Sequence, residues 1–184
     1  MEYPNWFAGA QHNFETYLTQ FRGKPELKFI QVGAFTGDAT EWLLDNILTN
    51  KSSILIDIDT WKGSDEEEHR KIDFENVFSY YKERTKDYLN LKIVKGKSED
   101  YLPTVQTDTI DFIYIDGNHT EAAVRLDILN AWKLLKSGAI LALDDYLWRG
   151  GLDSPKPAID WFLEEYKDSL TVLEHGYQVW VRKK

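Results

Sequence analysis

The chain has 184 residues, of which 42% are hydrophobic and 14% aromatic, so it can bury the core of one domain and is not a disordered protein. Its formal charge of −9 disfavours nucleic acid and anionic membranes as partners, and the lack of cysteine excludes disulfides and thiolate chemistry. No secretory signal or membrane span is evident, and we expect a single cytoplasmic domain over residues 1–184.

Short apolar runs alternate with longer amphipathic stretches, a pattern that is typical of βαβ units and a parallel sheet. Within the N-terminal segment 1–28, the amphipathic stretch 14–21 predicts a helix that packs on or near the core. Strands are predicted at 29–32, 54–59, 91–94, 110–115 and 139–143. Helices are predicted at 39–47, 74–88 and 120–136 and after Pro157. We expect Gly138 to end the third of these helices as a left-handed C-cap, and the runs 170–173 and 178–181 to form a closing hairpin.

Polar side chains, mostly carboxylates, follow the carboxyl end of each predicted strand. These segments are residues 33–38, 57–59, 96–99, 116–119 and 144–145. In an open parallel sheet, ligands bind at the carboxyl ends of the strands, near the point where the strand order reverses. We therefore predict that the functional site lies on this rim.

The turn from Gly33 to Gly37 lets the backbone pass close to a ligand, although a tight turn between strand and helix needs glycine in any case. Its Gly-x-x-x-Gly spacing differs from the Gly-x-Gly-x-x-Gly of dinucleotide enzymes, which weighs against an NAD-dependent oxidoreductase. Asp59 lies 26 positions beyond Gly33, where a carboxylate can accept hydrogen bonds from ribose hydroxyls, and Asp57 on the same strand face is the alternative. Either carboxylate can equally be a solvated strand end. Trp61 is expected either against a purine ring or in the core.

Asp116, Asp144 and Asp145 end strands that should be neighbours, and three converging carboxylates repel one another unless a cation lies between them. A hard divalent ion such as Mg²⁺ relieves that repulsion. The alternative is that Asp144 or Asp145 caps a turn while Asp116 orders its own loop. His119 follows Asp116 by three residues and is a candidate general base, or it only supports its loop.

The most distinctive stretches of the sequence read FIQVGAFTGDAT, ILIDIDTWKGS, DFIYIDGNHTEAAVRLDILNAWKLLKSGAILALDDY and PKPAIDWFLEEY. They resemble the class I S-adenosylmethionine-dependent methyltransferases, and in particular small bacterial and phage O-methyltransferases similar to the cephalosporin, macrolide-sugar and catechol enzymes. The resemblance implies an α/β, Rossmann-like fold. Its sheet would be seven-stranded and mostly parallel, with a C-terminal antiparallel hairpin and helices on both faces.

The resemblance also implies roles for residues on the rim. The cofactor S-adenosylmethionine would be held by Gln31, Gly33, Ala34, Phe35, Gly37, Asp59, Thr60, Trp61, Ser98, Glu99 and Asp116. The Mg²⁺ ligands would be Asp116, Asp144 and Asp145, and His119 lies near the position of the proton acceptor. Two positions depart from the family pattern: Gln31 replaces the usual acid, and Ala39 stands where many members present a hydroxyl.

We therefore expect an O-methyltransferase that acts on a small hydroxylated molecule with the assistance of a divalent metal ion. One alternative is a metal-independent methyltransferase with His119 as its base. Another is a non-catalytic binding module that keeps the fold, which Gln31 and Ala39 motivate. The aromatic N-terminal segment packs either on its own core or on a partner subunit of a homo-oligomer.

Overall fold

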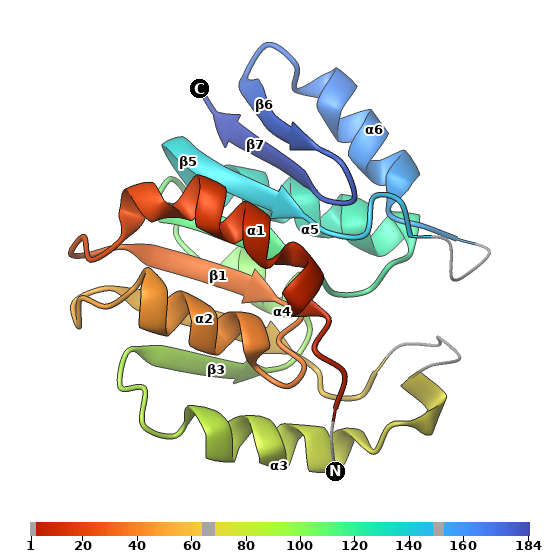
Figure 1. The fold of residues 1–184 in the computed structure, drawn as a ribbon. Coiled ribbons are helices and arrows are strands. Elements are labelled where there is room, and N and C mark those ends of the chain that lie inside the picture. Colours follow the sequence, from red (N-terminus) through yellow and green to blue (C-terminus); the bar gives the residue numbers. More distant parts are fainter. Residues whose placement is uncertain (1–2, 64–68, 149–152) are drawn as a thin grey trace.

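Seven strands form a single sheet in the order β3-β2-β1-β4-β5-β7-β6 (Figure 1). The computed structural model describes residues 3–63, 69–148 and 153–184. The strands are β1 (Lys28–Val32), β2 (Ile54–Asp59), β3 (Leu91–Lys95), β4 (Ile110–Ile115), β5 (Leu135–Leu143), β6 (Leu170–His175) and β7 (Val179–Lys183). β1 to β5 pair in parallel, and β7 runs antiparallel to both β5 and β6. This confirms the predicted mostly parallel sheet with a C-terminal antiparallel hairpin.

Helices cover both faces of the sheet, as predicted. They are α1 (Phe7–Leu18), α2 (Asp38–Asn46), α3 (Phe74–Thr85), α4 (Ser98–Tyr101), α5 (Glu121–Leu134) and α6 (Lys156–Glu165), with 3-10 turns η1 (Thr19–Phe21), η2 (His69–Lys71) and η3 (Leu102–Thr104). In Figure 1, α1 and α2 lie in front of the sheet and α5 lies behind it. The core is divided in the same way, because one buried cluster contains residues of α1 and α2 and another contains residues of α5 and α6.

Because successive side chains of a strand point to opposite faces of the sheet, each short apolar run contributes residues to both buried clusters. In β1, Phe29 belongs to the cluster under α1 and α2, whereas Ile30 belongs to the cluster under α5 and α6. Both side chains are fully buried, and burial of an apolar side chain of this size stabilises the fold by about 1.5–3 kcal/mol. Strands that are buried on both faces read as continuous apolar runs, which is why these strands are visible in the sequence.

The N-terminal helix and the end of α5 differ from the predictions. The buried stripe of the first helix is Ala10, Phe14 and Leu18, so α1 begins seven residues before the predicted start at residue 14 and ends in η1. α5 ends at Leu134 because Leu135 already pairs with Ile110 as the first residue of β5. Gly138 does adopt a left-handed conformation, with φ of 82°, but inside β5 and not as a helix cap.

The N-terminal helix packs on the chain's own core. The ring of Phe14 makes edge contacts with Phe112, Tyr114 and Trp180, at centroid distances between 5.0 and 5.9 Å. These three residues belong to β4 and β7, so α1 lies over the middle of the sheet. Its first turns reach the rim formed by the carboxyl ends of the strands, where Trp6, Gly9 and other residues of this segment line a cavity.

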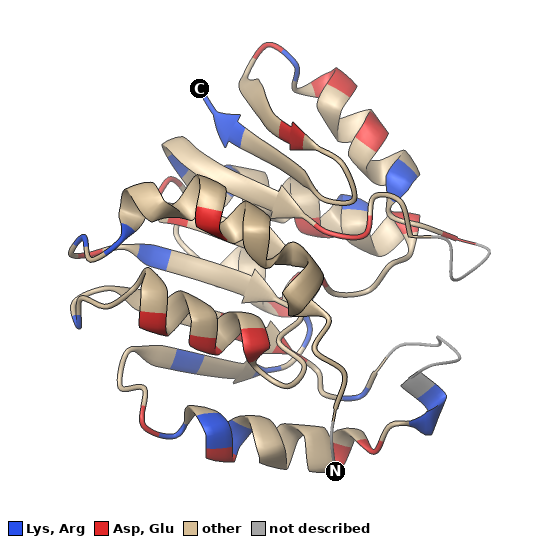
Figure 2. Cartoon of the chain, viewed as in Figure 1, with Lys and Arg blue, Asp and Glu red and all other residues tan. Residues whose placement is uncertain are grey.

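The excess of acidic residues is distributed over several elements. Figure 2 shows acidic positions along α2 and α6 and in the segment that follows β5. Among the described residues, no helix is long and apolar enough to cross a membrane.

Candidate active site

A cavity of about 880 Å³ opens at the carboxyl ends of the parallel strands, as predicted for the rim. The strand order reverses between β1 and β4, and the cavity is lined by residues that follow both strands. Residues of α1, of the turn after β1, of the ends of β2 and β3, of α5 and of the segment after β5 complete its wall. Ligand pockets of proteins span a similar range of volumes, about 300–1,000 Å³.

The turn after β1 depends on glycine at its first position. Gly33 has φ of 86°, and a Cβ atom added there would lie 1.7 Å from the carbonyl oxygen of Asp116 at the end of β4. No L side chain fits so close to a backbone oxygen, so Gly33 lets β1 and β4 end side by side. Gly37 also has a positive φ, of 88°, but it faces the ring of Tyr81 and does not line the cavity. Ala34 and Phe35 do line it.

Asp59 holds this turn from the end of β2. Its Oδ2 accepts hydrogen bonds from the backbone N–H groups of Ala34 and Phe35, at 2.8 and 3.0 Å. Its Oδ1 accepts one from the N–H of Trp61 at 2.7 Å. Asp59 and Thr60 both line the cavity. Each carboxylate oxygen can accept more than one hydrogen bond, so Asp59 fixes the turn and retains acceptor capacity toward the cavity.

Gln31 presents a buried acceptor to the cavity beside this turn. Its side chain is 2% exposed, and its Nε2 donates a hydrogen bond to the carbonyl oxygen of Gly33 at 2.9 Å. No described residue donates a hydrogen bond to its buried Oε1. A buried polar atom without a partner is costly, so Oε1 is an unused acceptor on a residue of the cavity wall.

Asp57 does not take the alternative position at the ribose. It is fully buried behind the turn, and its Oδ2 accepts hydrogen bonds from Thr40 Oγ1 at 2.5 Å and Tyr81 Oη at 2.7 Å. Burial raises the pKa of its carboxyl to about 7, although these two donors oppose the shift. Asp57 therefore belongs to the packing of α2 and α3 against β2.

Trp61 lies in the core and not against the cavity. It is 3% exposed, and its ring packs on Phe78 and Tyr81 of α3, at centroid distances of 4.5 and 4.8 Å. Its Nε1–H donates to the carbonyl oxygen of Phe35 at 2.9 Å. Of the two alternatives, the core position is therefore the one that the structure has, and Trp61 contributes by fixing the turn from behind.

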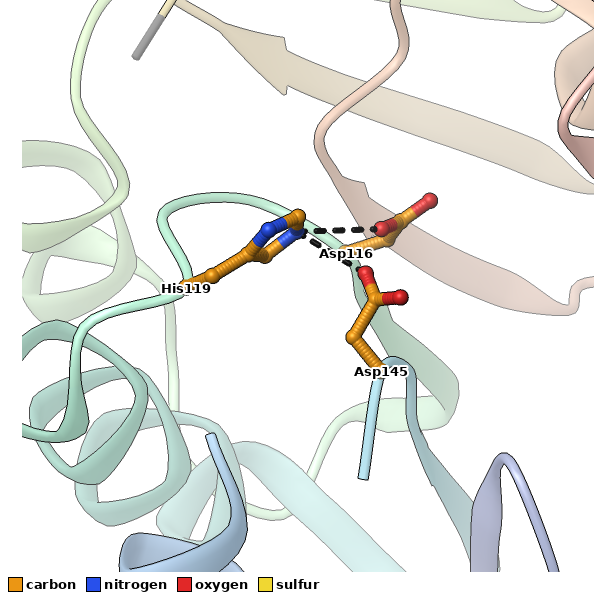
Figure 3. A group of neighbouring side chains, drawn as sticks. All are labelled: Asp116, His119 and Asp145. Carbon is orange, nitrogen blue, oxygen red and sulfur yellow. Dashed lines mark ion pairs between the residues drawn. The ribbon is translucent and has the colours of Figure 1, made fainter. Parts of the chain in front are cut away.

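Asp116, His119 and Asp145 come together where the segments after β4 and β5 line the cavity (Figure 3). The Nε2 atom of His119 lies 2.9 Å from Asp145 Oδ2 and 3.9 Å from Asp116 Oδ1, and all three ligand atoms lie within 4.8 Å of one another. The Nδ1 atom of His119 is buried, and the ring contacts Trp148 edge-on at 4.9 Å. Nε2 is therefore the nitrogen that faces the two carboxylates.

Asp144 points to a different set of neighbours. Its Oδ2 accepts hydrogen bonds from the hydroxyl of Tyr114 and from Nε2 of Gln178, the latter at 2.8 Å. Burial and the nearby carboxylates of Asp116 and Asp145 raise its pKa to about 7. Burial also raises the pKa of Asp116. The ligand atoms that lie together are therefore those of Asp116, His119 and Asp145. Asp144 also lines the cavity and shares the hydroxyl of Tyr114 with Asp116, to which Tyr114 donates at 3.1 Å.

The sequence reasoning missed the residues that support this acidic group. The Oε1 atom of Gln178 accepts hydrogen bonds from Asn13 Nδ2 and Trp180 Nε1, both at 2.9 Å, which orients its amide toward Asp144. Tyr177 donates a hydrogen bond to Asp145 Oδ1 at 2.8 Å. The only sequence signal for Gln178 is a polar residue at the start of an apolar strand.

The other end of the cavity lies beyond the ends of β2 and β3. Ser98 and Glu99, two of the residues that the resemblance assigns to the cofactor, line it. Asp127 of α5 also lines it, although it is only 3% exposed. It occupies a position on the apolar face of the predicted helix over 120–136, and a carboxylate on such a face is the signal that could have identified it. The acidic run 65–68 and Arg149 lie outside the described residues.

The fold is similar to that of several solved methyltransferases. The O-methyltransferase NovP is 17% identical with a TM-score of 0.71, and the match covers 95% of this chain and 79% of NovP. The O-methyltransferase TomG from Streptomyces achromogenes, solved in complex with SAM, is 16% identical with a TM-score of 0.66, and the match covers 99% and 82% of the two chains. The N-methyltransferase NodS from Bradyrhizobium japonicum WM9, solved in complex with S-adenosyl-L-homocysteine, is 16% identical with a TM-score of 0.63, and the match covers 97% and 88%. Enzymes that methylate different atoms thus share this fold.

No curated protein matches the sequence. A family model described as "Methyltransferase domain" matches residues 30–146, which is more than half of the chain and includes the glycine turn, Asp59, Asp116, His119 and Asp145. This match, together with the fold, confirms the family that the sequence resembles: the chain belongs to the methyltransferase domain family, in the class I S-adenosylmethionine-dependent fold.

Proposed function

We propose that this protein transfers a methyl group from S-adenosylmethionine to an oxygen atom of a small hydroxylated molecule, with a divalent metal ion at the acceptor. The observation that carries the proposal is the group of Asp116, His119 and Asp145, which lines the same cavity as the glycine turn and Gln31. A cofactor site and a group able to remove a proton therefore share one enclosed space.

The residues around the turn fit the cofactor. The amino acid part of S-adenosylmethionine carries an ammonium group, which is a hydrogen-bond donor. The buried Oε1 of Gln31 is an acceptor for which no described residue supplies a donor. Gln31 is neutral where the family resemblance implies an acid, so it offers hydrogen bonding without charge attraction. Asp59 at the end of β2 is placed to accept hydrogen bonds from the ribose hydroxyls. When bound, the cofactor supplies an electrophilic methyl group on a sulfonium.

The remaining task of the protein is to orient an acceptor hydroxyl and remove its proton. Nε2 of His119 contacts Asp145, and a carboxylate paired with an imidazole in this way fixes the ring and stabilises its protonated form. In the metal-independent alternative, neutral His119 carries its proton on Nδ1 and takes the proton of the acceptor hydroxyl at Nε2, and the carboxylate of Asp145 then pairs with the imidazolium that forms. Such a general base contributes about 10²–10⁴-fold to the rate.

A divalent cation fits the same three residues. Their ligand atoms lie within 4.8 Å of one another, and a cation there removes the repulsion between the carboxylates of Asp116 and Asp145. Two carboxylates and one imidazole suit Mn²⁺ or a similar ion better than Mg²⁺, which prefers oxygen ligands only. A bound cation lowers the pKa of an acceptor hydroxyl and fixes its direction. Asp144 then has a positioning role, because its hydrogen bonds with Tyr114 and Gln178 fix the end of β5.

The experiment is a methyl-transfer assay with isotopically labelled S-adenosylmethionine and a panel of phenols, catechols and sugars. Each acceptor is tested with EDTA, with Mg²⁺ and with Mn²⁺. Transfer to oxygen that EDTA abolishes and Mn²⁺ restores supports the metal-assisted reaction. Full activity in EDTA supports the metal-independent reaction with His119. Binding of S-adenosylmethionine without any methylated product contradicts O-methylation of this class of acceptor and favours the non-catalytic module.

A further inference from the structure

A buried carboxylate outside the group of Asp116, His119 and Asp145 also lines the cavity. Asp127 lies on the face of α5 that carries Val124 and Ile128 into the core, and it is 3% exposed. It nevertheless lines the cavity. A carboxylate at a core position is unfavourable unless hydrogen bonds satisfy it, so this residue requires a partner with donors.

The neighbours of Asp127 provide only part of the hydrogen bonding that a buried carboxylate requires. The hydroxyl of Ser98 at the start of α4 donates a hydrogen bond to the Asp127 carboxylate. Glu99 adds a second negative charge nearby, while Lys97 pairs with Glu99 at 2.7 Å. Burial and Glu99 raise the pKa of Asp127 to about 6, against the opposite effect of Ser98. This end of the cavity is therefore rich in acceptors and suits a ligand group that donates hydrogen bonds.

The strand order indicates which part of the cofactor reaches this end. β2 and β3 lie on one side of β1, and β4 and β5 lie on the other. Asp116, His119 and Asp145 follow β4 and β5, so the reacting part of an elongated ligand lies on that side. Asp59 ends β2, where a ribose is held. The base that the ribose carries therefore extends toward β3, α4 and Asp127, next to the apolar side chain of Leu126.

We propose that Asp127, held by Ser98, is the residue that selects the base of the cofactor, by accepting a hydrogen bond from the exocyclic amino group of adenine. A purine with a carbonyl oxygen at that position would place an acceptor against the Asp127 carboxylate. The site therefore discriminates 6-amino from 6-oxo purines. This inference rests on the proposed function, because it assumes that the cavity holds S-adenosylmethionine.

The test compares two ligands that differ at the 6-position and in the proton that the 6-oxo purine carries on N1. S-Adenosylhomocysteine and S-inosylhomocysteine are titrated calorimetrically into the wild-type protein, and the ratio of their Kd values is measured. We expect the wild type to prefer the adenosyl ligand by about tenfold or more, because a buried acceptor is left without a donor by the inosyl ligand. In Asp127→Asn, the amide N–H can face the 6-oxygen, so the ratio should fall toward one or invert.

A matched variant distinguishes the role of Asp127 from that of Glu99, the other acid at this end of the cavity. Glu99→Gln removes a charge at the same end of the cavity but leaves Asp127 in place, so both affinities should change alike and their ratio should persist. A ratio that collapses in Glu99→Gln and persists in Asp127→Asn would assign base selection to Glu99 and overturn the proposal. A wild-type ratio near one would overturn it as well.

A third ligand tests the proposal even if the Asp127→Asn variant does not fold. If Asp127→Asn does not fold, as judged by thermal melting, the N6,N6-dimethyl analogue of S-adenosylhomocysteine is titrated into the wild type instead. It has no N–H donor at this position and should bind about tenfold more weakly or worse, whereas equal binding overturns the proposal. Tight binding of S-adenosylhomocysteine with a ratio near one contradicts only the role of Asp127. No binding of either ligand contradicts the proposed function together with it.

Discussion

Replacement of Gly33 by alanine tests the geometry of the turn that joins the cofactor site to the acidic group. Two penalties apply to Gly33→Ala. A non-glycine residue at φ of 86° costs about 1–2 kcal/mol in backbone conformation. The added Cβ would also lie 1.7 Å from the carbonyl oxygen of Asp116, where real Cβ contacts stay beyond 3.0 Å.

The second penalty cannot be relieved by a side-chain rotation. The obstructing atom is backbone, and the N–H of Asp116 donates to the carbonyl oxygen of Val32 at 2.8 Å, which ties the ends of β4 and β1 together. Relief therefore requires β1 and β4 to separate at the site itself. We expect a total loss of about 3–5 kcal/mol in the free energy of unfolding, in the range of severe core substitutions.

Gly138→Ala is the matched control. Gly138 has nearly the same φ, 82°, but no described atom lies within 4 Å of the added Cβ, so only the conformational penalty of about 1–2 kcal/mol applies. Urea unfolding of both variants, followed by circular dichroism, measures the difference. A loss in Gly33→Ala that exceeds the loss in Gly138→Ala by about 2 kcal/mol or more supports the close approach. Equal losses would refute it.

Four further results are expected. Asp145→Asn should lower methyl transfer by about 10²-fold or more, because Asp145 contacts Nε2 of His119, while calorimetry finds unchanged binding of S-adenosylhomocysteine; unchanged turnover would exclude the pair from the chemistry. EDTA should abolish turnover, and Mn²⁺ should restore it better than Mg²⁺. Activity that is unchanged in EDTA would mean that His119 removes the proton of the acceptor without a metal ion. The raised pKa of Asp57 means that the folded state keeps a proton that the unfolded state releases near pH 4, so its contribution to stability should fall as the pH rises from about 4 to 7, by at most about 4 kcal/mol. Urea unfolding of Asp57→Asn should show a smaller slope than the wild type, because Asp144 and Asp127 also have raised pKa values and keep their contributions, whereas an equal slope would contradict the assignment to Asp57. Gly9→Leu should raise the KM for the acceptor and leave the melting temperature intact, because Gly9 lines the cavity and no described atom lies within 4 Å of its added Cβ; an unchanged KM for every acceptor would place the acceptor elsewhere.

The fold was predictable because its central strands, β1, β2, β4 and β5, are largely buried on both faces. Runs such as residues 110–115 and 139–143 leave little doubt about strand identity, and the rim follows from their parallel arrangement. The boundary at Gly138 was not predictable from local signals. A left-handed glycine after an amphipathic helix is the usual sign of a cap, but the pairing of Leu135 with Ile110 ends the helix earlier.

The positions of the site residues along the chain were predictable, but the directions of their side chains were not. Asp144 and Asp145 are adjacent, but the backbone leaves the extended conformation at Asp145, so the two side chains take different directions. Asp144 therefore meets Tyr114, whereas Asp145, with a positive φ of 59°, turns toward His119. Trp61 is a similar case, because its positive φ of 45° directs the ring to α3 and away from the cavity.

The central claim is that the cavity at the ends of β1, β2 and β4 binds S-adenosylmethionine although Gln31 replaces the usual acid. The most direct measurement is a calorimetric titration of the protein with S-adenosylmethionine, repeated with NAD⁺. We predict saturable one-to-one binding of S-adenosylmethionine at roughly micromolar Kd, corresponding to about −8 kcal/mol, and no comparable heat with NAD⁺. The absence of heat with S-adenosylmethionine at several temperatures, or stronger binding of NAD⁺, would contradict the account.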